Sequence, residues 1–562
     1  MRVEKLLTDH IDIWSCARQT RATAGRGSSG KIDLYGIKKL RELILELAVR
    51  GKLVPQDPND EPASELLKRI AAEKAELVKQ GKIKKQKPLP EIREEEKPFE
   101  LPEGWEWVRL IDLGTWALGS GFPASIQGVA NKEILMCKVS DMNLQGNEKF
   151  IISTNNTISE DVALQKKINV SDPGTIIFPK IGGAIATNKR RILIKKTAID
   201  NNCLGIKPFN SLNVEWFFLI LNSIDMAKYQ SGTSVPAINQ SIIGNIVVAL
   251  PPTNMQKHIA RKVEELMSLC DQLEQQSLTS LDAHQQLVET LLATLTDSQN
   301  TEELTANWAR ISQHFDTLFT TEASIDALKQ TILQLAVMGK LVPQDPDDEP
   351  ASELLKRIEQ EKAQWVKEGK IKKRKSFLKK GDGKIYELPN GWVKCPLGDI
   401  ITISSGDGLT SKQMAVDGNI PVYGGNGITG YHDNWNVDKP TIVIGRVGYY
   451  CGSVHITPSL AWVTDNAFIT YYSKNNIDAC FLSLLLKGTN LKENENATAQ
   501  PVISGSKIYP IEIMLPPLNE QKKIVRKFFE LNCLCDTLKS RLQSAQQTQL
   551  HLADALTEAA LN

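Results

Sequence analysis

The stretch LAVRGKLVPQDPNDEPASELLKRI at residues 47–70 returns as LAVMGKLVPQDPDDEPASELLKRI at residues 335–358. The copies differ only at Arg50, replaced by Met338, and at Asn59, replaced by Asp347. So close a match cannot come from similar composition, so the chain is a tandem duplication. We therefore expect two similar modules in similar surroundings. A protein with two copies of one reader can contact two places on a long ligand.

Each copy of this repeat continues a helix that begins upstream of it. Apolar residues recur there at helical spacing: Ile37, Leu40, Ile44 and Leu47 in the first copy, and Ile325, Leu328, Ile332 and Leu335 in the second. Gly51 and Gly339 follow the last apolar turn, where a helix commonly ends. The PQDP segments predict loops, and second helices should then run to about Val78 and Val366.

A second pair of matched motifs frames the region after each repeat. LPEGW at 101–105 and LPNGW at 388–392 open it, and LPPTNMQKHI at 250–259 and LPPLNEQKKI at 515–524 close it. Between these borders, short β-branched runs such as 174–178 and 441–445 alternate with Gly and Asn turns. The pattern predicts two domains of short strands, whose sequences differ inside shared borders. The apolar run at 214–224 is too short to span a membrane and predicts a buried helix.

Long helices are expected after both closing motifs, because about 40 residues pass without a proline, enough for a helix of about 60 Å. Each carries an interrupted apolar stripe, of the kind that usually packs one helix against another. The stripe residues are Ile259, Val263, Leu266, Leu273, Leu281 and Leu287 in the first copy, and Ile524, Val525, Leu531, Leu534, Leu538 and Leu552 in the second. Cys270-Asp271 and Cys535-Asp536 occupy equivalent places.

This order of motifs resembles the specificity subunit of type I restriction–modification enzymes. The opening and closing motifs, the repeats and the PVYGGNGI run at 421–428 carry the resemblance, which covers essentially the whole chain. It implies an α/β (α+β) fold in which two similar target recognition domains are separated by two long antiparallel coiled-coil helices, with pseudo-two-fold symmetry. Each recognition domain would bind one half of a split DNA sequence. Because the two inserts differ, the target should be asymmetric.

The resemblance also implies a division of the chain and a set of partners. The expected parts are an N-terminal helical repeat and basic linker (1–100), recognition domain 1 (101–250), a central long helix (251–298), a second helical repeat and linker (299–387), recognition domain 2 (388–515) and a distal long helix (516–562). The expected partners are double-stranded DNA, two methyltransferase subunits and two restriction subunits acting as endonuclease and translocase. S-adenosylmethionine, ATP and Mg²⁺ would belong to those subunits, and no cofactor to this chain. The stripe residues Ile259, Val263, Leu266, Leu273, Ile524, Leu531, Leu534 and Leu538 would serve the spacer or dock partners.

Candidate DNA contacts gather in a basic stretch of the first strand domain. Between Asp172 and Asp200 there is no acid, while Lys180, Lys189, Arg190, Arg191, Lys195 and Lys196 are all basic. Such side chains can reach phosphates or guanine edges, although a solvated hairpin face is the alternative. Lys180-Ile-Gly182 aligns with Arg446-Val-Gly448, which makes Lys180 and Arg446 the foremost candidates. The pairs 200–201 and 465–466, and Thr233 and Thr498, also align, but could equally form turns.

The second strand domain gives a weaker signal, since acids outnumber bases by three between 387 and 515. Its candidates are Lys412, Arg446 and Lys507, together with the glycine-rich loop 419–432, which either reads bases or only shapes the domain. The basic tracts at 82–87 and 370–375 either contact phosphates or are solvated helix ends.

Other functions find little support in the sequence. Gly25–Lys31 nearly spells a nucleotide-binding loop, but Ile32 replaces the hydroxyl residue and no strand precedes it. The seven histidines show no metal-ligand pairing, His258 is expected on a surface, and no nucleophile–base pair is evident. We therefore expect no catalysis and no metal. The net charge of +1 neither favours nor excludes nucleic acid as a ligand. The lack of a signal peptide or membrane span, and nine cysteines without a Cys-x-x-Cys pair, favour a reduced cytoplasm, which the resemblance implies is bacterial. The alternative is a coiled-coil scaffold carrying two domains that bind other ligands, and a nucleotide-using enzyme is a more distant one.

Overall fold

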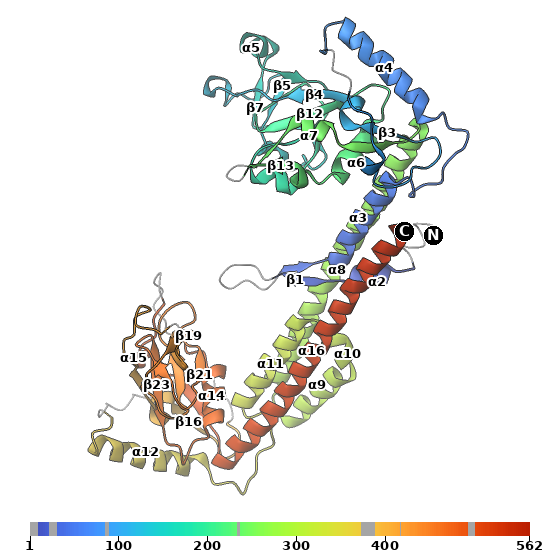
Figure 1. Ribbon diagram of the computed structural model, residues 1–562. Coiled ribbons are helices and arrows are strands. Elements are labelled where there is room, and N and C mark those ends of the chain that lie inside the picture. The colour runs from blue at the N-terminus through green and yellow to red at the C-terminus, as the bar shows by residue number, and fades with distance from the viewer. Residues whose placement is uncertain are drawn as a thin grey trace. The chain divides into compact units, whose positions relative to one another are not determined.

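The computed structural model describes residues 9–21, 31–84, 89–232, 236–371, 388–415, 417–492 and 501–561. The chain divides into two compact units. Unit 1 holds Met1–Thr279 and Gln546–Asn562, and unit 2 holds Ser280–Ala545. In each unit a domain of short strands adjoins a group of helices (Figure 1). No helix of the described residues is both long enough and apolar enough to cross a membrane.

Unit 1 begins with short elements and two helices, and continues into the first strand domain. The first elements are α2 (Ile11–Cys16), β1 (Gln19–Arg21), β2 (Lys31–Asp33), α3 (Tyr35–Val49), α4 (Ala63–Lys79) and η1 (Glu94–Glu96). The strand domain contains β3 (Glu106–Arg109), η2 (Leu110–Leu113), β4 (Gly114–Leu118), η3 (Ala124–Ile126), β5 (Ile134–Cys137), η4 (Asp141–Asn143), β6 (Phe150–Ile151), β7 (Asn156–Ile158), α5 (Glu160–Gln165), β8 (Val170–Ser171), β9 (Ile176–Pro179), η5 (Gly183–Thr187), β10 (Arg191–Leu193), β11 (Thr197–Ile199), β12 (Cys203–Pro208), α6 (Val214–Ser223), η6 (Met226–Tyr229), β13 (Gln230–Ser231), β14 (Ala237–Ile238), α7 (Gln240–Gly244) and β15 (Val247–Leu250). The long helix α8 (Thr253–Asp297) follows, and its residues from Ser280 onward belong to unit 2.

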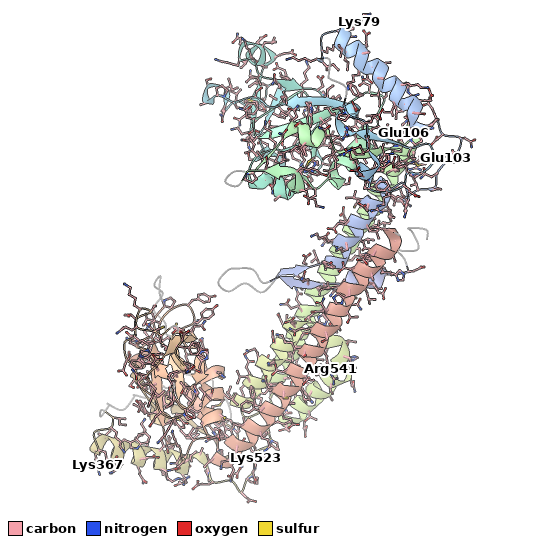
Figure 2. The ribbon with its side chains drawn as sticks, in the orientation of Figure 1. Lys79, Glu103, Glu106, Lys367, Lys523 and Arg541 are labelled. Atoms are coloured by element: carbon pink, nitrogen blue, oxygen red, sulfur yellow. The ribbon has the colours of Figure 1, made fainter. Side chains whose placement is uncertain are left out.

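Unit 2 repeats this order. Its helices are α9 (Thr301–Gln313), α10 (Phe315–Leu318), α11 (Glu322–Val337) and α12 (Ala351–Lys367). The second strand domain contains β16 (Val393–Pro396), α13 (Leu397–Ile400), β17 (Ile401–Ser405), β18 (Ile420–Gly424), β19 (Gly427–His432), β20 (Ile442–Gly445), β21 (Val454–Ile456), β22 (Trp462–Val463), β23 (Ala467–Tyr472), α14 (Ala479–Gly488), α15 (Gly505–Ile508) and β24 (Glu512–Leu515). The long helix α16 (Leu518–Leu561) follows, and its residues from Gln546 onward belong to unit 1. Figure 2 shows Lys79 at the end of α4, and Lys367 at the end of its counterpart α12.

The larger sheets of the two strand domains share four antiparallel strands in the same order, and unit 1 adds the parallel edge strand β6. The larger sheet has the order β4-β12-β9-β10-β6 in unit 1 and β17-β23-β20-β21 in unit 2. The apolar runs predicted as strands form the equivalent members β9 and β20, which are buried along their whole length. The apolar helix predicted at 214–224 is α6, with Trp216, Phe217, Ile220 and Leu221 buried. The mixed α and β architecture inferred from the sequence is confirmed.

A glycine and a tryptophan tie each repeat to the strand domain that follows it. Gly51 has a φ of +67°, and a Cβ built there would lie 2.6 Å from Pro102 and 2.8 Å from the Trp105 ring. Gly339 has a φ of +72° and stands in the same relation to Pro389 and Trp392. Glycine is therefore required twice over: for the left-handed turn that ends the helix and for the close approach of the indole. The predicted helix ends are confirmed, since α3 stops at Val49 and α11 at Val337.

The closing motif works through a buried glutamine. In unit 1 the Gln256 side chain accepts from the Asn213 amide at 2.9 Å and donates to the Pro251 carbonyl at 3.1 Å. In unit 2 Gln521 accepts from the Asp478 amide at 2.9 Å and donates to the Pro516 carbonyl at 3.1 Å. Both glutamines are fully buried. Each long helix is thereby joined to the helix of the strand domain, because one amide satisfies a buried donor and a buried acceptor.

The long helices pack by the predicted stripes in part. Ile259, Val263, Leu266 and Ile524 are buried, and Leu273, Leu531 and Leu538 are half-buried. In unit 2 a core joins the last turns of α8, the helix α11 and the first half of α16, with Val288, Leu292, Leu295 and Cys535 among its members. Within this unit α8 and α16 run in opposite directions (Figure 1).

Three stripe residues were predicted wrongly. Leu287, Leu534 and Leu552 are exposed at 51%, 61% and 41%, while their chain neighbours Val288, Cys535 and Ala553 are buried. One residue turns a helical position by about 100°, so each leucine lies off the packing face. The leucine pattern alone overlooked the smaller residues that continue the seam.

Candidate nucleic-acid interface

Lys180 leaves the end of β9 in a loop held by backbone hydrogen bonds. Its amide donates to the Asn202 carbonyl at 2.8 Å, and its carbonyl accepts from the Ile238 amide at 2.8 Å. Two residues on, the Gly182 amide donates to the Pro236 carbonyl at 2.7 Å. The half-buried Lys180 side chain makes no hydrogen bond or ion pair with any described residue. Its ammonium is therefore available to an external anion.

Arg446 occupies the same position in unit 2. Its amide donates to the Asn466 carbonyl at 2.9 Å, and its carbonyl accepts from the Ile503 amide at 2.9 Å. The Gly448 amide donates to the Pro501 carbonyl at 2.9 Å. These bonds match those of unit 1 one by one. The alignment of Lys180-Ile-Gly182 with Arg446-Val-Gly448 is confirmed.

The guanidinium of Arg446 is partly held by its own domain. One terminal nitrogen lies 3.2 Å from the Asp465 carbonyl and 3.4 Å from Ser405 Oγ, and the group stacks 5.5 Å from the centre of the Phe468 ring. The Nε atom is buried without a partner among the described residues. This anchoring orients the arginine, while the side chain stays partly exposed.

The neighbouring Asp–Asn pairs are shifted by one residue from the predicted alignment. Asn202, and not Asn201, matches Asn466, because these two carbonyls receive the equivalent bonds. Asp200 then matches Thr464, and each side chain accepts from the amide two residues on, at 3.1 Å and 3.3 Å. Asp200 therefore forms a turn, as the alternative interpretation of these residues held. Thr233 and Thr498 lie outside the described residues.

Arg190 is a structural residue, and the prediction that it contacts DNA is wrong. Its side chain is 2% exposed, and the guanidinium donates to the carbonyls of Leu221 at 3.2 Å and Ile224 at 2.9 Å. It also donates to Asn188 Oδ1 at 2.8 Å. Burial lowers the pKa of Arg190 to about 10. The charge caps the carboxyl end of α6, where a cation satisfies the last carbonyls, so a phosphate cannot reach it.

The flanking basic residues are intermediate cases. The Arg191 guanidinium donates to the carbonyls of Arg190 at 2.7 Å and Met142 at 2.9 Å, and burial lowers its pKa. Lys189 is half-buried and bonds to Asn143 Oδ1. Lys195 and Lys196 are exposed, and Lys196 pairs with Glu160 at 2.7 Å. The six basic residues therefore do not form one continuous charged face. The side chains of Lys180 and Lys195 have no partner among the described residues, and Lys180 is the one whose loop recurs in unit 2.

The remaining candidates of unit 2 lie on separate elements. Lys412 is exposed in the loop before β18, and the half-buried Lys507 lies on α15. The region 419–432, expected to be a loop, is mostly the hairpin of β18 and β19. Ile428 and Tyr431 are exposed on it at 51% and 47%, while Tyr423 is buried. The sequence did not predict the antiparallel pair β18 and β19, because glycines interrupt the alternating pattern that is typical of strands.

Several predicted features fall partly or wholly on undescribed residues. Of the nucleotide-loop-like segment only Lys31 belongs to a described strand, and Lys85–Lys87 and 372–375 of the basic tracts lie outside. Within the described parts of the chain, no cluster of three His, Cys, Asp or Glu side chains could hold a metal ion. His258 is exposed as expected.

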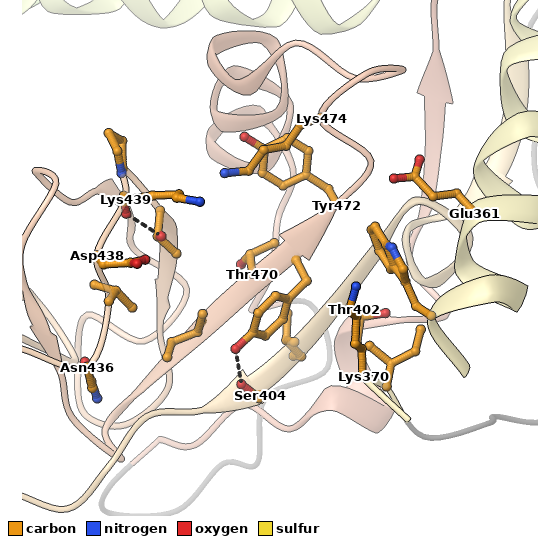
Figure 3. Close-up of a pocket in the computed structure, with 18 of the residues that line it drawn as sticks. Glu361, Lys370, Thr402, Ser404, Asn436, Asp438, Lys439, Thr470, Tyr472 and Lys474 are labelled. Atoms are coloured by element: carbon orange, nitrogen blue, oxygen red, sulfur yellow. Dashed lines mark hydrogen bonds between the residues drawn. The ribbon is translucent and has the colours of Figure 1, made fainter. Parts of the chain in front are cut away.

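Unit 2 also contains a cavity of about 880 Å³ beside α12 (Figure 3). Lys370, Lys439 and Lys474 line it together with Trp365 and Tyr471, and Ser404 Oγ lies 3.4 Å from the Tyr471 hydroxyl. Ser404 and Ser405 are consecutive on β17, so their side chains project to opposite faces of the strand. Since Arg446 contacts Ser405, this cavity is not part of the Arg446 surface.

Comparison with known proteins gives a consistent family. Residues 102–283 and 389–546 match the type I restriction modification DNA specificity domain. The chain is 48% identical to the Escherichia coli type I restriction enzyme EcoEI specificity subunit, over 100% of both chains. It is equally 48% identical to the EcoAI specificity subunit of the same organism, again over 100% of both chains.

Solved structures of lower similarity were also found. One, from work on the structural basis of complex assembly and conformational transition of the type I R-M system, has 18% identity and a TM-score of 0.48, covering 83% of this chain and 99% of that one. The HsdS subunit from Thermoanaerobacter tengcongensis has 17% identity and a TM-score of 0.41, covering 83% and 98%.

The duplicated frame and the matched relatives define a DNA specificity component of restriction–modification systems. The chain belongs to the family of type I restriction enzyme specificity subunits. In these systems the specificity subunit is the non-catalytic component. The alternative of a scaffold with two domains for other ligands is not supported by these relatives.

Proposed function

We propose that this chain binds an asymmetric, bipartite DNA target and directs methyltransferase and restriction subunits to it. Recognition domain 1 (101–250) would contact one half-site, and recognition domain 2 (388–515) the other. The observation that carries the proposal is the pair of equivalent loops around Lys180 and Arg446, fixed by the same backbone bonds but surrounded by different side chains. Two domains with the same backbone but different surface side chains are what the recognition of two different half-site sequences requires.

Affinity and sequence reading would come from different contacts. Lysine and arginine side chains that reach phosphates give binding that weakens with salt, while groove contacts give sequence preference. The exposed Lys412 and the loop cations Lys180 and Arg446 would supply the first kind. Polar groups on the β18–β19 hairpin, such as Asn426, would supply the second kind.

The long helices would act as spacer and docking surface. At 1.5 Å per residue, the 45 residues of α8 and the 44 of α16 give lengths of about 66–68 Å. Half-sites are engaged only at a separation that the protein permits, so helix length would set the unread gap. Leu534 is the most exposed large apolar residue of α16, and Leu287 is also exposed on α8. Because they do not serve the internal seam, they are suited to contact companion subunits.

The assembled enzyme would carry two methyltransferase and two restriction subunits and act in the cytoplasm. It would methylate adenine at N6 and cleave DNA in an ATP-dependent reaction. S-adenosylmethionine, ATP and Mg²⁺ would then be bound by the companions, and this chain would need none of them.

The test is a footprint of the full chain with its methyltransferase subunits, on a target found by sequencing methylated adenines. We expect two protected half-site sequences separated by an unprotected gap. Deleting one helical turn from both α8 and α16 should change the preferred gap and leave both half-site sequences unchanged. One uninterrupted protected sequence, or a gap that ignores the deletion, would contradict the proposal. The matched control is a deletion of equal length within α9, which should leave half-site sequences and gap as they are.

A further inference from the structure

The loop after Arg446 presents two exposed tyrosines. Tyr449 and Tyr450 are each 48% exposed, with ring centres 5.0 Å apart and planes at 87°. Neither phenol hydroxyl has a hydrogen-bond partner among the residues that the structure describes. Two adjacent large rings open to solvent are unusual for a surface that has no ligand, because their apolar area favours burial.

The same loop of unit 1 has no aromatic residue. The amides of Ile185 and Cys451 donate to the carbonyls of Gly182 and Gly448, at 3.1 Å and 2.9 Å, so the register of the two loops holds through this turn. Gly183 and Ala184 therefore stand where unit 2 has Tyr449 and Tyr450. The difference is confined to side chains on a shared backbone turn, and it marks a change in what the loop contacts.

The tyrosines border a recess suited to nucleic acid. A cavity of about 360 Å³ is lined by both rings and by the polar residues Ser411, Asn426, Thr429, Thr464 and Asn466. No carboxylate is among the residues that line it. Lys492 donates to the Tyr449 carbonyl at 2.7 Å and lies 5.5 Å from the centre of the Tyr449 ring. Amide and hydroxyl groups, aromatic faces and nearby cations are the groups that contact base edges, bases and phosphates.

We propose that Tyr449 and Tyr450 form an aromatic wedge that stacks on a partly opened base step of the second DNA half-site. This rests on the proposed function and extends it to one half-site only. Inserted side chains unstack a step, and pyrimidine–purine steps open most easily. The second half-site should therefore contain such a step at a fixed position, read by the deformability of the duplex. The first half-site, facing Gly183 and Ala184, carries no such requirement.

The test uses the full chain with its companion subunits and duplexes that carry 2-aminopurine at each purine of the second half-site in turn. Apart from the adenine that a companion methyltransferase flips out of the duplex, fluorescence should rise on binding at one step and stay low elsewhere. The double variant Tyr449→Gly/Tyr450→Ala, which copies unit 1, should abolish the rise and weaken binding about tenfold, within the range for lost base stacking. The variant Tyr449→Phe/Tyr450→Phe keeps the rings and should keep the rise.

The outcomes separate this inference from the proposed function. A split footprint with no fluorescent step overturns the wedge alone, and so does a loss in the phenylalanine variant equal to that in the glycine–alanine variant. The absence of a protected second half-site overturns the proposed function and the wedge with it. Lys180→Ala is the matched control, since it should weaken binding at the first half-site and leave the fluorescence rise in place.

Discussion

The two strand domains differ least at their borders and most at their loops. Gly51 with Trp105, and Gln256 at the closing motif, recur in unit 2 with contacts that match to within a few tenths of an ångström. The loops at 180–184 and 446–450 share a backbone and carry different side chains. The two copies therefore keep the same residues where side chains hold the fold together, and differ where side chains face outward.

The largest expected effect is the loss of stability when a basic residue that holds the fold is replaced, compared with a neighbouring basic residue that does not. Arg190→Ala would leave a cavity and the buried carbonyls of Leu221 and Ile224 without donors, and should lower the free energy of unfolding of unit 1 by about 4 kcal/mol. Urea denaturation followed by hydrogen exchange would measure it. Lys189→Ala, next to it and half-buried, should cost less than about 1 kcal/mol. Equal losses from both variants would contradict the structural role of Arg190.

A second variant pair tests whether the closing motifs do the same work. Gln256→Ala and Gln521→Ala each remove one acceptor and one donor from buried backbone groups, so each should cost about 2 kcal/mol. Hydrogen exchange should show the loss in unit 1 for the first variant and in unit 2 for the second. If only one variant lost stability, the two closing motifs would not be structurally equivalent.

The third prediction concerns DNA. Lys180→Ala should weaken binding about tenfold through the first half-site, and Arg446→Ala should do so through the second, since one lost charged contact costs about 1–2 kcal/mol. Binding to targets with one half-site scrambled would measure each separately. Arg446→Lys, which copies unit 1, should recover part of the loss. Weakening at the same half-site by both variants would refute the assignment.

The smallest effect is expected at a border position where one copy has a buried carboxyl group and the other copy has an uncharged residue. Trp392 donates to Glu520 at 3.0 Å, whereas Trp105 donates to Gln56 at 2.8 Å, and Met255 replaces the glutamate in unit 1. Burial raises the pKa of Glu520 above its ordinary value of 4.5. Its protonated form is therefore favoured on folding, so its contribution is present below about pH 4.5 and is lost as the pH rises through the raised pKa.

Glu520→Met should remove this dependence. The wild type should lose stability relative to the variant as the pH rises above about 4.5, and the loss should be small because hydrogen bonds from Gln344 and Trp392 stabilise the charged carboxylate against the effect of burial. Denaturation of both proteins from pH 4 to 8 would measure the difference. A difference that stays constant with pH would show that Glu520 keeps its ordinary pKa in the folded chain.

The sequence predicted the elements that repeat and missed those that do not. Duplicated motifs gave the helix ends at Gly51 and Gly339, and the alignment of Lys180 with Arg446, because two copies constrain each other. Local charge failed for Arg190, since a run of basic residues does not tell which side chain folds back to cap α6. The prediction that Leu534 packs against another helix was wrong, because hydrophobicity alone cannot distinguish a leucine on the packing face from an outward-facing leucine beside a buried cysteine.

The border strands have a consequence for how such a molecule can change. The entering strand β3 pairs antiparallel with the leaving strand β15, so Glu106 lies opposite Leu250, and in unit 2 Val393 lies opposite Leu515 in the same way. The chain thus enters and leaves each strand domain at neighbouring positions. The segment between these strands can gain, lose or exchange whole loops without displacing the helices that follow. The recognised DNA sequence can therefore change in evolution while the way the subunits assemble stays the same.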